Sequence, residues 1–466
     1  MDRYFAVVAR GVEFLAAKEL VAMGAADVRE VVGGVHFSGP PEILYRALLT
    51  LQTASRVLKP LREFAATTPE MVYSQVRRVV WEAYLNPQRT LAVSATAEKP
   101  PPGPGGRSSR PPQSYSRGGP RGGGRGGDRF DRDRRSNEPP PPPLGGTTWL
   151  MNTMFAAQKI KDAICDRLKN EQGARPNVDK EQPDISIQAH FAGGRCTLSL
   201  DATGPGSLHE RGYRGEHGAG GAAPMKETLA AAILQLTGWN GLVPLYDPLC
   251  GSGTLVIEAA RIAMRMPAGG GRAFFACEKW PDFDGTVWAQ VTTELRSKQL
   301  RKPPAPIFGS DASETQLLAA KDNAYRAKVD RGIEFILRNV EDAVPPTDEP
   351  GIVVTNPPYG IRLGDEERLA GFYTKLGEIF RTRFPGWIVY MLIGNLDLVQ
   401  HLGMEADDTH RLMNGPISCR LMKFDLTNAP RTPVEPKPVE LPADSGDTAS
   451  GDAESDETDL DDDEDV

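Results

Sequence analysis

The sequence predicts an α/β protein whose second half is a doubly wound parallel sheet and whose first half is a smaller α+β region. From about residue 241 onward, short apolar strands alternate with segments whose apolar residues have helical spacing, which is typical of a parallel sheet. Residues 1–55 follow the order strand, helix, strand, strand, helix, with Gly33-Gly34 as a hairpin signal between the middle strands. This order is typical of a ferredoxin-like module.

Each predicted element rests on hydrophobic spacing and on the turn residues at its ends. Before residue 210, the predicted strands are 4–9, 28–32, 35–37, 57–64, 91–95, 185–192 and 196–201, and the predicted helices are 12–23, 41–51, 69–80 and 153–169. After residue 240, the predicted strands are 243–246, 307–311, 334–337, 351–355 and 387–393, and the predicted helices are 254–265, 314–328 and 367–383.

The net charge of −8 is distributed unevenly over the 466 residues. Residues 100–146 contain nine Arg and four acidic residues, with three Arg-Gly-Gly repeats and a proline run, whereas residues 441–466 contain 12 acidic residues and no Lys or Arg. Neither segment has enough apolar residues to offset the entropy of ordering, so we expect a disordered insert at 98–146 and a disordered acidic tail at 429–466. The insert has the composition of RNA-binding Arg-Gly segments, and a solvated linker is the alternative.

The five cysteines are scattered and form no Cys-x-x-Cys pair, which is typical of reduced thiols in a cytoplasmic protein. The first residues lack the basic start and apolar stretch of a signal peptide, and no run of about 18 apolar residues occurs. We therefore expect a cytoplasmic protein with no membrane contact and no bound metal. The composition does not indicate an oligomeric state.

A glycine-rich turn follows the predicted strand 243–246. Its sequence, Asp-Pro-Leu-Cys-Gly-Ser-Gly-Thr at 247–254, begins at a strand end and ends at a helix start. Glycines let the backbone turn sharply and approach a ligand closely, and the helix N-terminus offers free N–H groups. The turn is not a P-loop, because no Lys follows Gly253, and it lacks the third glycine of a dinucleotide fingerprint. An ordinary strand–helix turn is the alternative interpretation.

Asp311 ends the next predicted strand, 307–311. An acidic side chain at such a strand end in an open α/β sheet can accept hydrogen bonds from both hydroxyls of a ribose. A role as the N-cap of the following helix is the alternative. The position of Asp311, one strand after the glycine turn, favours the ribose.

A third string, Asn356-Pro357-Pro358-Tyr359, follows an apolar strand. Two prolines are costly inside a sheet, so the string is expected just past the strand end, at the ligand-facing edge. The amide oxygen of Asn356 and the carbonyl of Pro357 can both accept hydrogen bonds from one NH₂ group, and Tyr359 offers a ring face for stacking of a base. The string indicates a site for a conjugated exocyclic amine, with a proline-rich turn as the alternative.

Together, the strings at 247–254 and 356–359 resemble the cofactor loop and the target-amine site of class I S-adenosylmethionine-dependent amino-methyltransferases. Four more strings resemble the THUMP-domain RNA methyltransferases, specifically the bacterial RlmL-type enzymes that methylate guanine N2 in large-subunit rRNA. These strings are 161–167, 178–184, 207–214 and 226–234. The resemblance covers roughly 1–97 and 147–428, and the insert and the tail depart from it.

The resemblance implies a ferredoxin-like module at 1–55, a THUMP RNA-binding domain at 56–203 interrupted by the insert, and a Rossmann-like methyltransferase domain at 204–428. It implies S-adenosyl-L-methionine as cofactor and RNA as partner, with 23S rRNA expected and tRNA as the alternative. An adenine-N6 DNA methyltransferase or a protein glutamine methyltransferase shares the Asn-Pro-Pro-Tyr string but fits the first 200 residues or the insert less well. A non-catalytic RNA-binding protein with an inactive methyltransferase domain is the alternative of a different class.

The resemblance also implies roles for single residues. The residues expected at the target guanine are Asn356, Pro357, Pro358 and Tyr359. The residues expected at the cofactor from the glycine turn are Asp247, Pro248, Gly251, Ser252, Gly253 and Thr254. Asp311 would bind the cofactor's ribose, and Asp342 would lie near its adenine, with a solvated loop acid as the alternative for Asp342.

Between the two halves, the 207–214 string holds a histidine and two arginines. His209 lies next to an acidic residue, and a structural role is expected for it. Arg211 and Arg214 flank Tyr213, so they either contact RNA phosphates or brace the connection between the halves.

Overall fold

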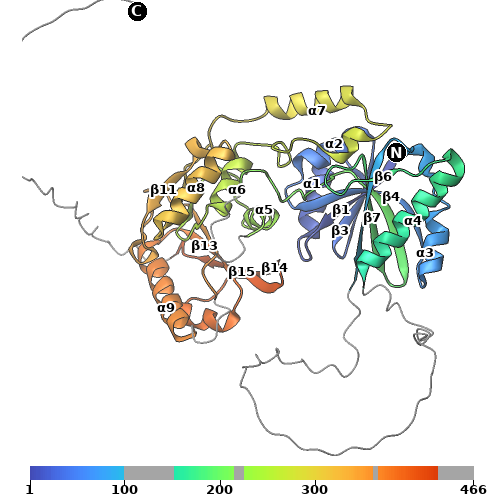
Figure 1. Cartoon of the computed structure of the whole chain (residues 1–466). Helices are drawn as coiled ribbons and strands as arrows, with labels where there is room; N and C mark the ends of the chain where they lie inside the picture. The colour runs from blue at the N-terminus through green and yellow to red at the C-terminus, as the bar shows by residue number, and fades with distance from the viewer. Residues whose placement is uncertain (99–151, 215–224, 360–365, 429–466) are drawn as a thin grey trace, which may run out of the picture. The chain divides into compact units, whose positions relative to one another are not determined.

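The computed structural model describes residues 1–98, 152–214, 225–359 and 366–428 (Figure 1). Apart from residue 98, the predicted insert and the predicted acidic tail lie outside the described residues. The described residues form two sheets. Among them, no helix is long and apolar enough to cross a membrane. All five cysteines are buried and free of disulfides.

The first sheet has eight strands in the order β2-β3-β1-β4-β8-β7-β5-β6. Its strands are β1 (Asp2–Val8), β2 (Ala26–Val31), β3 (Gly34–Gly39), β4 (Ala54–Ala65), β5 (Thr90–Ala97), β6 (Asn177–Val178), β7 (Ile185–Ala192) and β8 (Arg195–Asp201). The helices of this region are α1 (Glu13–Ala22), α2 (Pro41–Thr50), α3 (Pro69–Val76) and α4 (Thr153–Gln172), with the short η1 (Trp81–Ala83).

The hairpin predicted from Gly33-Gly34 is confirmed. Gly33 has φ +83°, where other residues are strained, and a Cβ atom on Gly34 would lie 2.2 Å from the Phe5 ring, so the turn favours glycine at the first position and requires it at the second. The ferredoxin-like order of β1, α1, β2, β3 and α2 is confirmed as well. Strand β4 pairs with β1 on one side and with β8 on the other, so the ferredoxin-like strands and the later strands share one continuous sheet.

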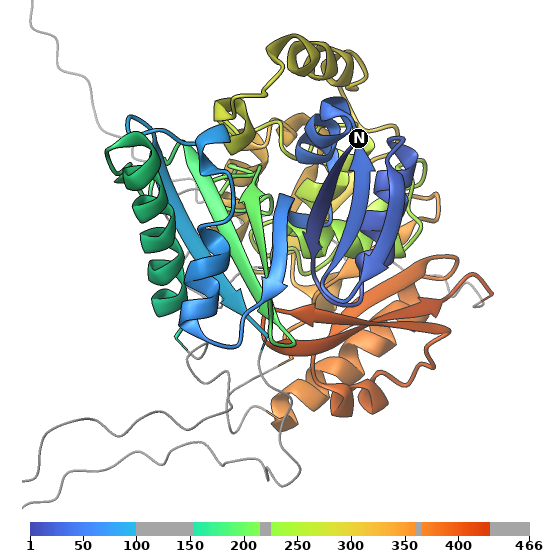
Figure 2. The ribbon, with the colours of Figure 1, turned by 90° about the vertical axis from the view of Figure 1, so that its right-hand side faces the viewer.

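The helix predicted at 153–169 is α4, and its ends have well-defined caps. The side chain of Asn152 accepts a hydrogen bond from the Phe155 N–H at 3.0 Å, and Gly173 ends the helix with φ +79°. Helices α3 and α4 pack on each other, and α4 covers β5 (Figure 2). Helix α3 ends at Val76, earlier than the predicted 69–80, because the chain turns there into η1 around the buried Trp81.

The second sheet has seven strands in the order β11-β10-β9-β12-β13-β15-β14. Its strands are β9 (Leu245–Asp247), β10 (Ile307–Asp311), β11 (Glu334–Leu337), β12 (Ile352–Thr355), β13 (Ile388–Ile393), β14 (Asp408–Asn414) and β15 (Ile417–Asp425). Its helices are α5 (Glu227–Leu236), α6 (Thr254–Ala263), α7 (Gly285–Ser297), α8 (Glu314–Arg326) and α9 (Glu366–Arg383), with the shorter η3 (Ala276–Lys279), η4 (Asp330–Gly332), η5 (Val340–Asp342) and η6 (Leu396–Leu402).

The predicted doubly wound parallel sheet is confirmed for the strands from β11 to β13, which all pair in parallel. The last two strands form an antiparallel hairpin, β14–β15, that was not predicted. Strand β12 is buried along its whole length: Ile352 and Val354 belong to the apolar cluster that includes α5 and α6, whereas Val353 belongs to the cluster around α9. Helices therefore cover both faces of the sheet.

Candidate active site

The carboxyl ends of three parallel strands bring the predicted site residues to one edge of the second sheet. Strand β9 lies between β10 and β12, and the chain runs outward from β9 first on one side and then on the other. In such sheets, ligands bind outside the strand ends at this reversal of strand order. Asp247 ends β9, Asp311 ends β10, and Asn356 follows β12. The predicted strand-end positions of these three residues are confirmed.

The glycine turn joins β9 to α6 in a conformation that needs its glycines. Gly251 has φ +52° and Gly253 has φ +86°. A Cβ atom on Gly253 would lie 3.1 Å from the Cβ atom of Ala320, whereas one on Gly251 would meet nothing closer than 4.0 Å. The turn is thus packed against α8 at Gly253 and open in front of Gly251. Free N–H groups at the start of α6 lie directly behind this open side.

Asp311 is hydrogen-bonded to the glycine turn itself. One carboxylate oxygen accepts from the N–H of Gly251 at 2.9 Å, and the other accepts from the N–H of Ser313 at 2.9 Å. The N-cap of α8 is Ser313, whose side chain accepts from the N–H of Gln316, so the alternative of Asp311 as the helix cap is wrong. Asp311 is half-buried, and each of its oxygens keeps a further lone pair for a ligand.

Asp247 is buried, with 2% of its surface exposed. Its Oδ1 atom accepts hydrogen bonds from the hydroxyl of Thr355 at 2.7 Å and from the N–H of Leu249 at 3.1 Å, which tie β9 to the end of β12. Burial raises the pKa of Asp247 to about 7, and the nearby charge of Asp311 acts in the same direction. Asp247 therefore changes charge close to neutral pH.

The remaining residues of the turn form hydrogen bonds with side chains that lie outside the turn. The buried Pro248 offers its carbonyl to the Ser310 hydroxyl at 3.5 Å. The carbonyl of Ser252 accepts from the side chain of Asn323 at 3.0 Å, and the hydroxyl of Thr254 accepts from Arg214 at 3.1 Å. Neither hydrogen bond was predicted from the sequence: Asn323 lies in a segment with no motif, and the 207–214 string does not indicate that Arg214 reaches Thr254.

Arg214 also forms an ion pair with Glu227, with 2.6 Å between Nε and Oε1, at the start of α5. Arg211 is fully buried and donates to the carbonyls of Leu208 at 2.8 Å and Gln52 at 2.7 Å. Both arginines therefore brace the connection, which confirms that alternative for them. His209 bonds to the Ser207 hydroxyl at 2.7 Å, in agreement with a structural role.

Asn356 has an orphaned acceptor. Its Oδ1 atom is buried and has no hydrogen-bond partner among the described residues. A buried acceptor without a donor costs free energy, about 1–3 kcal/mol in mutational data. Next to it Pro357 is buried and Pro358 is exposed. The site is therefore ready to receive an N–H donor.

Tyr359 is half-buried, and residues at the ends of β13 and β14 hold it in place. Its hydroxyl oxygen accepts a hydrogen bond from the Asn414 side-chain nitrogen at 2.7 Å. Its ring lies against Gly394, where a Cβ atom would be 2.7 Å from the ring atom Cδ2. Burial raises the pKa of Tyr359, so its hydroxyl stays neutral at physiological pH. The ring is thus fixed beside Asn356.

Asp342 lies at the end of η5, after β11, and is exposed. The adjacent Glu341 is exposed too and lines a hollow of about 520 Å³ next to Pro358. The proposed contact of Asp342 with adenine stays a prediction. Among the described residues, no group of three or more His, Cys, Asp or Glu side chains could hold a metal ion.

Three family models match the chain in succession. Residues 3–58 match the RlmL ferredoxin-like domain, 147–201 match the THUMP domain, and 211–423 match the RMKL-like methyltransferase domain. A Synechocystis sp. protein, slr0064, described as a candidate RNA methyltransferase, is 34% identical over 91% of this chain and 96% of its own length. The chain belongs to the RlmL-type THUMP-domain methyltransferase family. It is a class I methyltransferase, and S-adenosylmethionine is the methyl donor of this family.

Two further relatives extend the comparison. The ribosomal RNA large subunit methyltransferase K/L of Syntrophotalea carbinolica is 37% identical over 93% of this chain and 56% of its own length. The chain thus spans about half the length of the K/L relatives that it matches. The crystal structure of SMU.472, a candidate methyltransferase solved with S-adenosylhomocysteine, has a TM-score of 0.73 and 26% identity, covering 93% of this chain and 99% of that chain.

Proposed function

We propose that this protein transfers a methyl group from S-adenosylmethionine to the exocyclic N2 amine of a guanine in large-subunit rRNA. The observation that carries the proposal is the orphaned, buried Oδ1 atom of Asn356 beside a fixed Tyr359 ring. An exocyclic amine supplies the missing donor, and the aromatic ring supplies a stacking face for the base. The names of the K/L relatives point to large-subunit rRNA as the substrate.

The residues at the sheet edge fit the cofactor. The open side of Gly251 and the free N–H groups of α6 suit the methionine part, which Asp247, Pro248, Ser252, Gly253 and Thr254 would surround. Asp311 would accept hydrogen bonds from the ribose hydroxyls with its free lone pairs. Asp342 would lie near the adenine. When bound, the cofactor supplies a methyl group that its sulfonium already activates.

The contribution of the protein is then orientation of the amine. The lone pair of a guanine N2 amine is delocalised into the ring, so the amine is a weak nucleophile. Asn356 Oδ1 and the Pro357 carbonyl would accept its two hydrogens and favour a localised lone pair directed at the methyl group. Tyr359 would hold the base plane, and positioning for in-line attack would supply most of the rate. Methyl transfer would leave a positively charged methylated amine, which is strongly acidic and would lose its extra proton to water.

The base has to leave its helix or loop to reach Asn356, so an unstacked or locally opened guanine is the expected substrate. The ferredoxin-like and THUMP regions, 1–55 and 56–203, would hold the surrounding RNA, and the methyltransferase domain, 204–428, would carry the chemistry. The segments 98–146 and 429–466 remain a proposed insert and tail. Ribosomal RNA as substrate places the reaction in the cytoplasm.

Transfer of labelled methyl groups to unmodified rRNA and tRNA, followed by nucleoside analysis, tests the proposal. The expected product is N2-methylguanosine in large-subunit rRNA. Label in tRNA alone would move the substrate to tRNA, and N6-methyladenosine would contradict the guanine assignment. Cofactor binding without transfer to any RNA would contradict the proposed substrate, and absence of cofactor binding would favour the non-catalytic RNA-binding alternative.

A further inference from the structure

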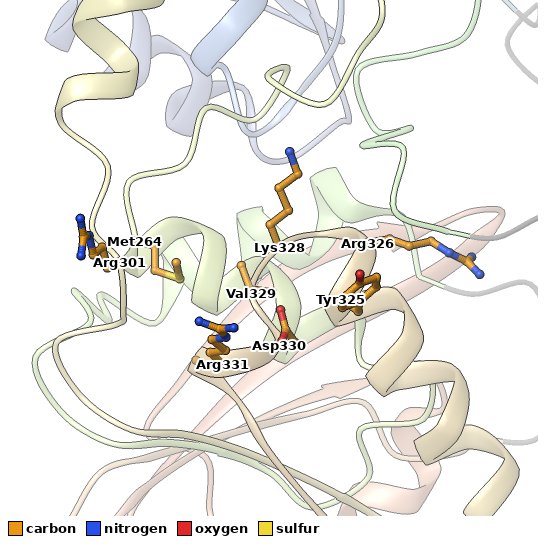
Figure 3. Close-up of a pocket in the computed structure, with 9 residues that line it drawn as sticks. Met264, Arg301, Tyr325, Arg326, Lys328, Val329, Asp330 and Arg331 are labelled. Carbon is orange, nitrogen blue, oxygen red and sulfur yellow. The ribbon is translucent and has the colours of Figure 1, made fainter.

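A basic hollow of about 480 Å³ lies at the opposite edge of the second sheet from the candidate active site (Figure 3). The hollow lies at the C-terminal ends of α6 and α8 and at the points where the chain enters β10 and β11. It is therefore at the amino ends of the parallel strands. The residues that line it are Met264, Arg301, Tyr325, Arg326, Lys328, Val329, Asp330, Arg331 and Gly332. None of them belongs to the candidate active site.

The floor and the rim of the hollow differ in chemistry. Met264 and Val329 are buried and give it an apolar floor, whereas the arginine and lysine side chains of the rim are exposed. Tyr325 also stands at the rim, with 71% of its surface exposed. A ligand that suits this arrangement has a flat or apolar part and carries negative charge. A nucleotide of a nucleic acid strand has both properties.

Three of the cations are free to bind such a ligand. Among the described residues, Arg301, Lys328 and Arg331 form no ion pair, and Figure 3 shows their side chains coming from separate points around the hollow. Arg326 is instead paired with Asp322 at 2.5 Å, and its side chain extends away from the other three. Asp330 and Glu334 add negative charge near the hollow. Two further basic residues, Arg265 and Lys302, directly follow lining residues in the sequence, so the net charge around the hollow stays positive.

Two basic residues at this edge have a strained backbone. Arg265 has φ +56° and Lys328 has φ +61°, and each follows a helix end, where the chain reverses with hydrogen bonds from Met266 N to Arg261 O and from Val329 N to Ala324 O. Glycine is the usual residue at this helix-end position. A basic side chain at the same place in both helices is therefore kept at a cost in backbone strain, which favours a use for the charge.

We propose that this hollow is a second RNA contact, in which Arg301, Lys328 and Arg331 bind backbone phosphates and Tyr325 stacks on an unpaired base. The proposal rests on the proposed RNA substrate. Strand β10 has five residues, so the two edges of the sheet are roughly 17 Å apart. A substrate helix of about five base pairs spans that distance. The RNA would pass over β11, which is the edge strand of the sheet.

Salt-dependent binding of the full chain to an unmodified 23S rRNA transcript tests the proposal. The test variant is Arg301→Gln/Lys328→Gln/Arg331→Gln. The matched control is Arg296→Gln/Lys321→Gln/Arg411→Gln, which removes the same charge from exposed positions outside the hollow. Loss of three phosphate contacts should make the slope of log affinity against log salt concentration shallower by about 2. The factor by which the wild type binds RNA more tightly than the test variant should therefore fall about 20-fold between about 50 and about 200 mM salt.

The control variant is expected to keep the slope of the wild type within experimental error. Tyr325→Ala is expected to weaken RNA binding about fivefold at every salt concentration without a change of slope, because stacking releases no counterions. Equal slopes for the wild type and the test variant, or an equal loss in the control, would overturn the proposal. The proposal would also be overturned if the test variant kept its RNA affinity but lost binding to a poly-glutamate peptide. The hollow would then bind an acidic protein.

Two readouts separate this proposal from the proposed function. S-adenosylmethionine affinity should be the same in wild type, test and control variants, which shows that the methyltransferase domain stays folded. Methyl transfer to the rRNA by the wild type is measured in the same samples. If the wild type transfers no methyl group to the rRNA, the proposed rRNA substrate is wrong. If it does transfer methyl groups but the test variant binds RNA as the wild type does, only the proposed RNA contact in the hollow is wrong.

Discussion

The side-chain nitrogen of Asn414 donates a hydrogen bond to the hydroxyl oxygen of Tyr359 at 2.7 Å, across 55 residues of sequence. Asn414 ends β14, in the antiparallel hairpin at the edge of the second sheet, whereas Tyr359 follows β12. The hydroxyl of Tyr359 is therefore engaged with the protein, so a base at this site would meet the ring of Tyr359 and not its hydroxyl. The hairpin thus takes part in shaping the target site.

Removal of this hydrogen bond is expected to slow methyl transfer without affecting the cofactor. In Asn414→Ala and in Tyr359→Phe, kcat should fall about fivefold, because one neutral hydrogen bond that orients the ring is lost. The double variant should be no slower than either single variant, with a coupling energy of about 1 kcal/mol. Single-turnover rates and S-adenosylmethionine affinities measure this cycle. Additive effects of the two substitutions would show that the two side chains act independently.

Gly394 is expected to tolerate no side chain, because it lies directly against the ring of Tyr359. A Cβ atom at residue 394 would lie 2.7–3.0 Å from three ring atoms, so Gly394→Ala has to displace the ring. We expect methyl transfer to fall about tenfold or more, as when a reacting group is misplaced, with cofactor affinity retained.

The matched control is Gly371→Ala, on the exposed face of α9, where a Cβ atom would meet nothing within 4 Å. This control should leave the rate unchanged and raise the free energy of unfolding by up to about 1 kcal/mol, since alanine favours helix. Wild-type rates in Gly394→Ala would contradict the assigned position of the ring.

The buried carboxylate of Asp247 predicts a pH-dependent stability. Its pKa is raised from 3.8 to about 7 in the folded chain, so the folded state binds more protons than the unfolded state between these values. The contribution of Asp247 to the free energy of unfolding therefore decreases as pH rises from about 4 to about 7. Asp247→Asn lacks this titration and keeps an acceptor for Thr355.

Urea unfolding of wild type and Asp247→Asn at several pH values tests this point. The stability of the variant relative to the wild type should increase by on the order of 3 kcal/mol across that window and stay constant above it. A difference that does not depend on pH would mean that burial does not raise the pKa of Asp247.

The parallel part of the fold and the strand-end residues are predictable because each depends on local signals. Strand β12 is buried on both faces, so it reads as a continuous apolar run, and the prolines after it fix where it ends. Strand β9 begins at Leu245, later than the predicted 243–246, because Leu242 and Val243 are exposed and Pro244 has no N–H to donate.

The supports of the site could not be predicted in the same way. Strand β14 lies at the sheet edge and buries only Leu412 among its seven residues, so its sequence carries no clear strand signal and does not single out Asn414. Helix α7 buries only Val291 and was missed for the same reason. Arg214 and Asn323 act through tertiary contacts that have no fixed spacing from the motifs they support.

In the proposed reaction, the orphaned amide oxygen of Asn356 receives the target amine. The most direct test is single-turnover methyl transfer by Asn356→Ala on an RNA that the wild type methylates, with S-adenosylmethionine affinity measured on the same preparation. We predict wild-type cofactor affinity and a rate reduced about 100-fold or more, because the variant lacks an acceptor that orients the amine in the transition state. A wild-type rate with intact cofactor binding would show that Asn356 does not hold the target amine.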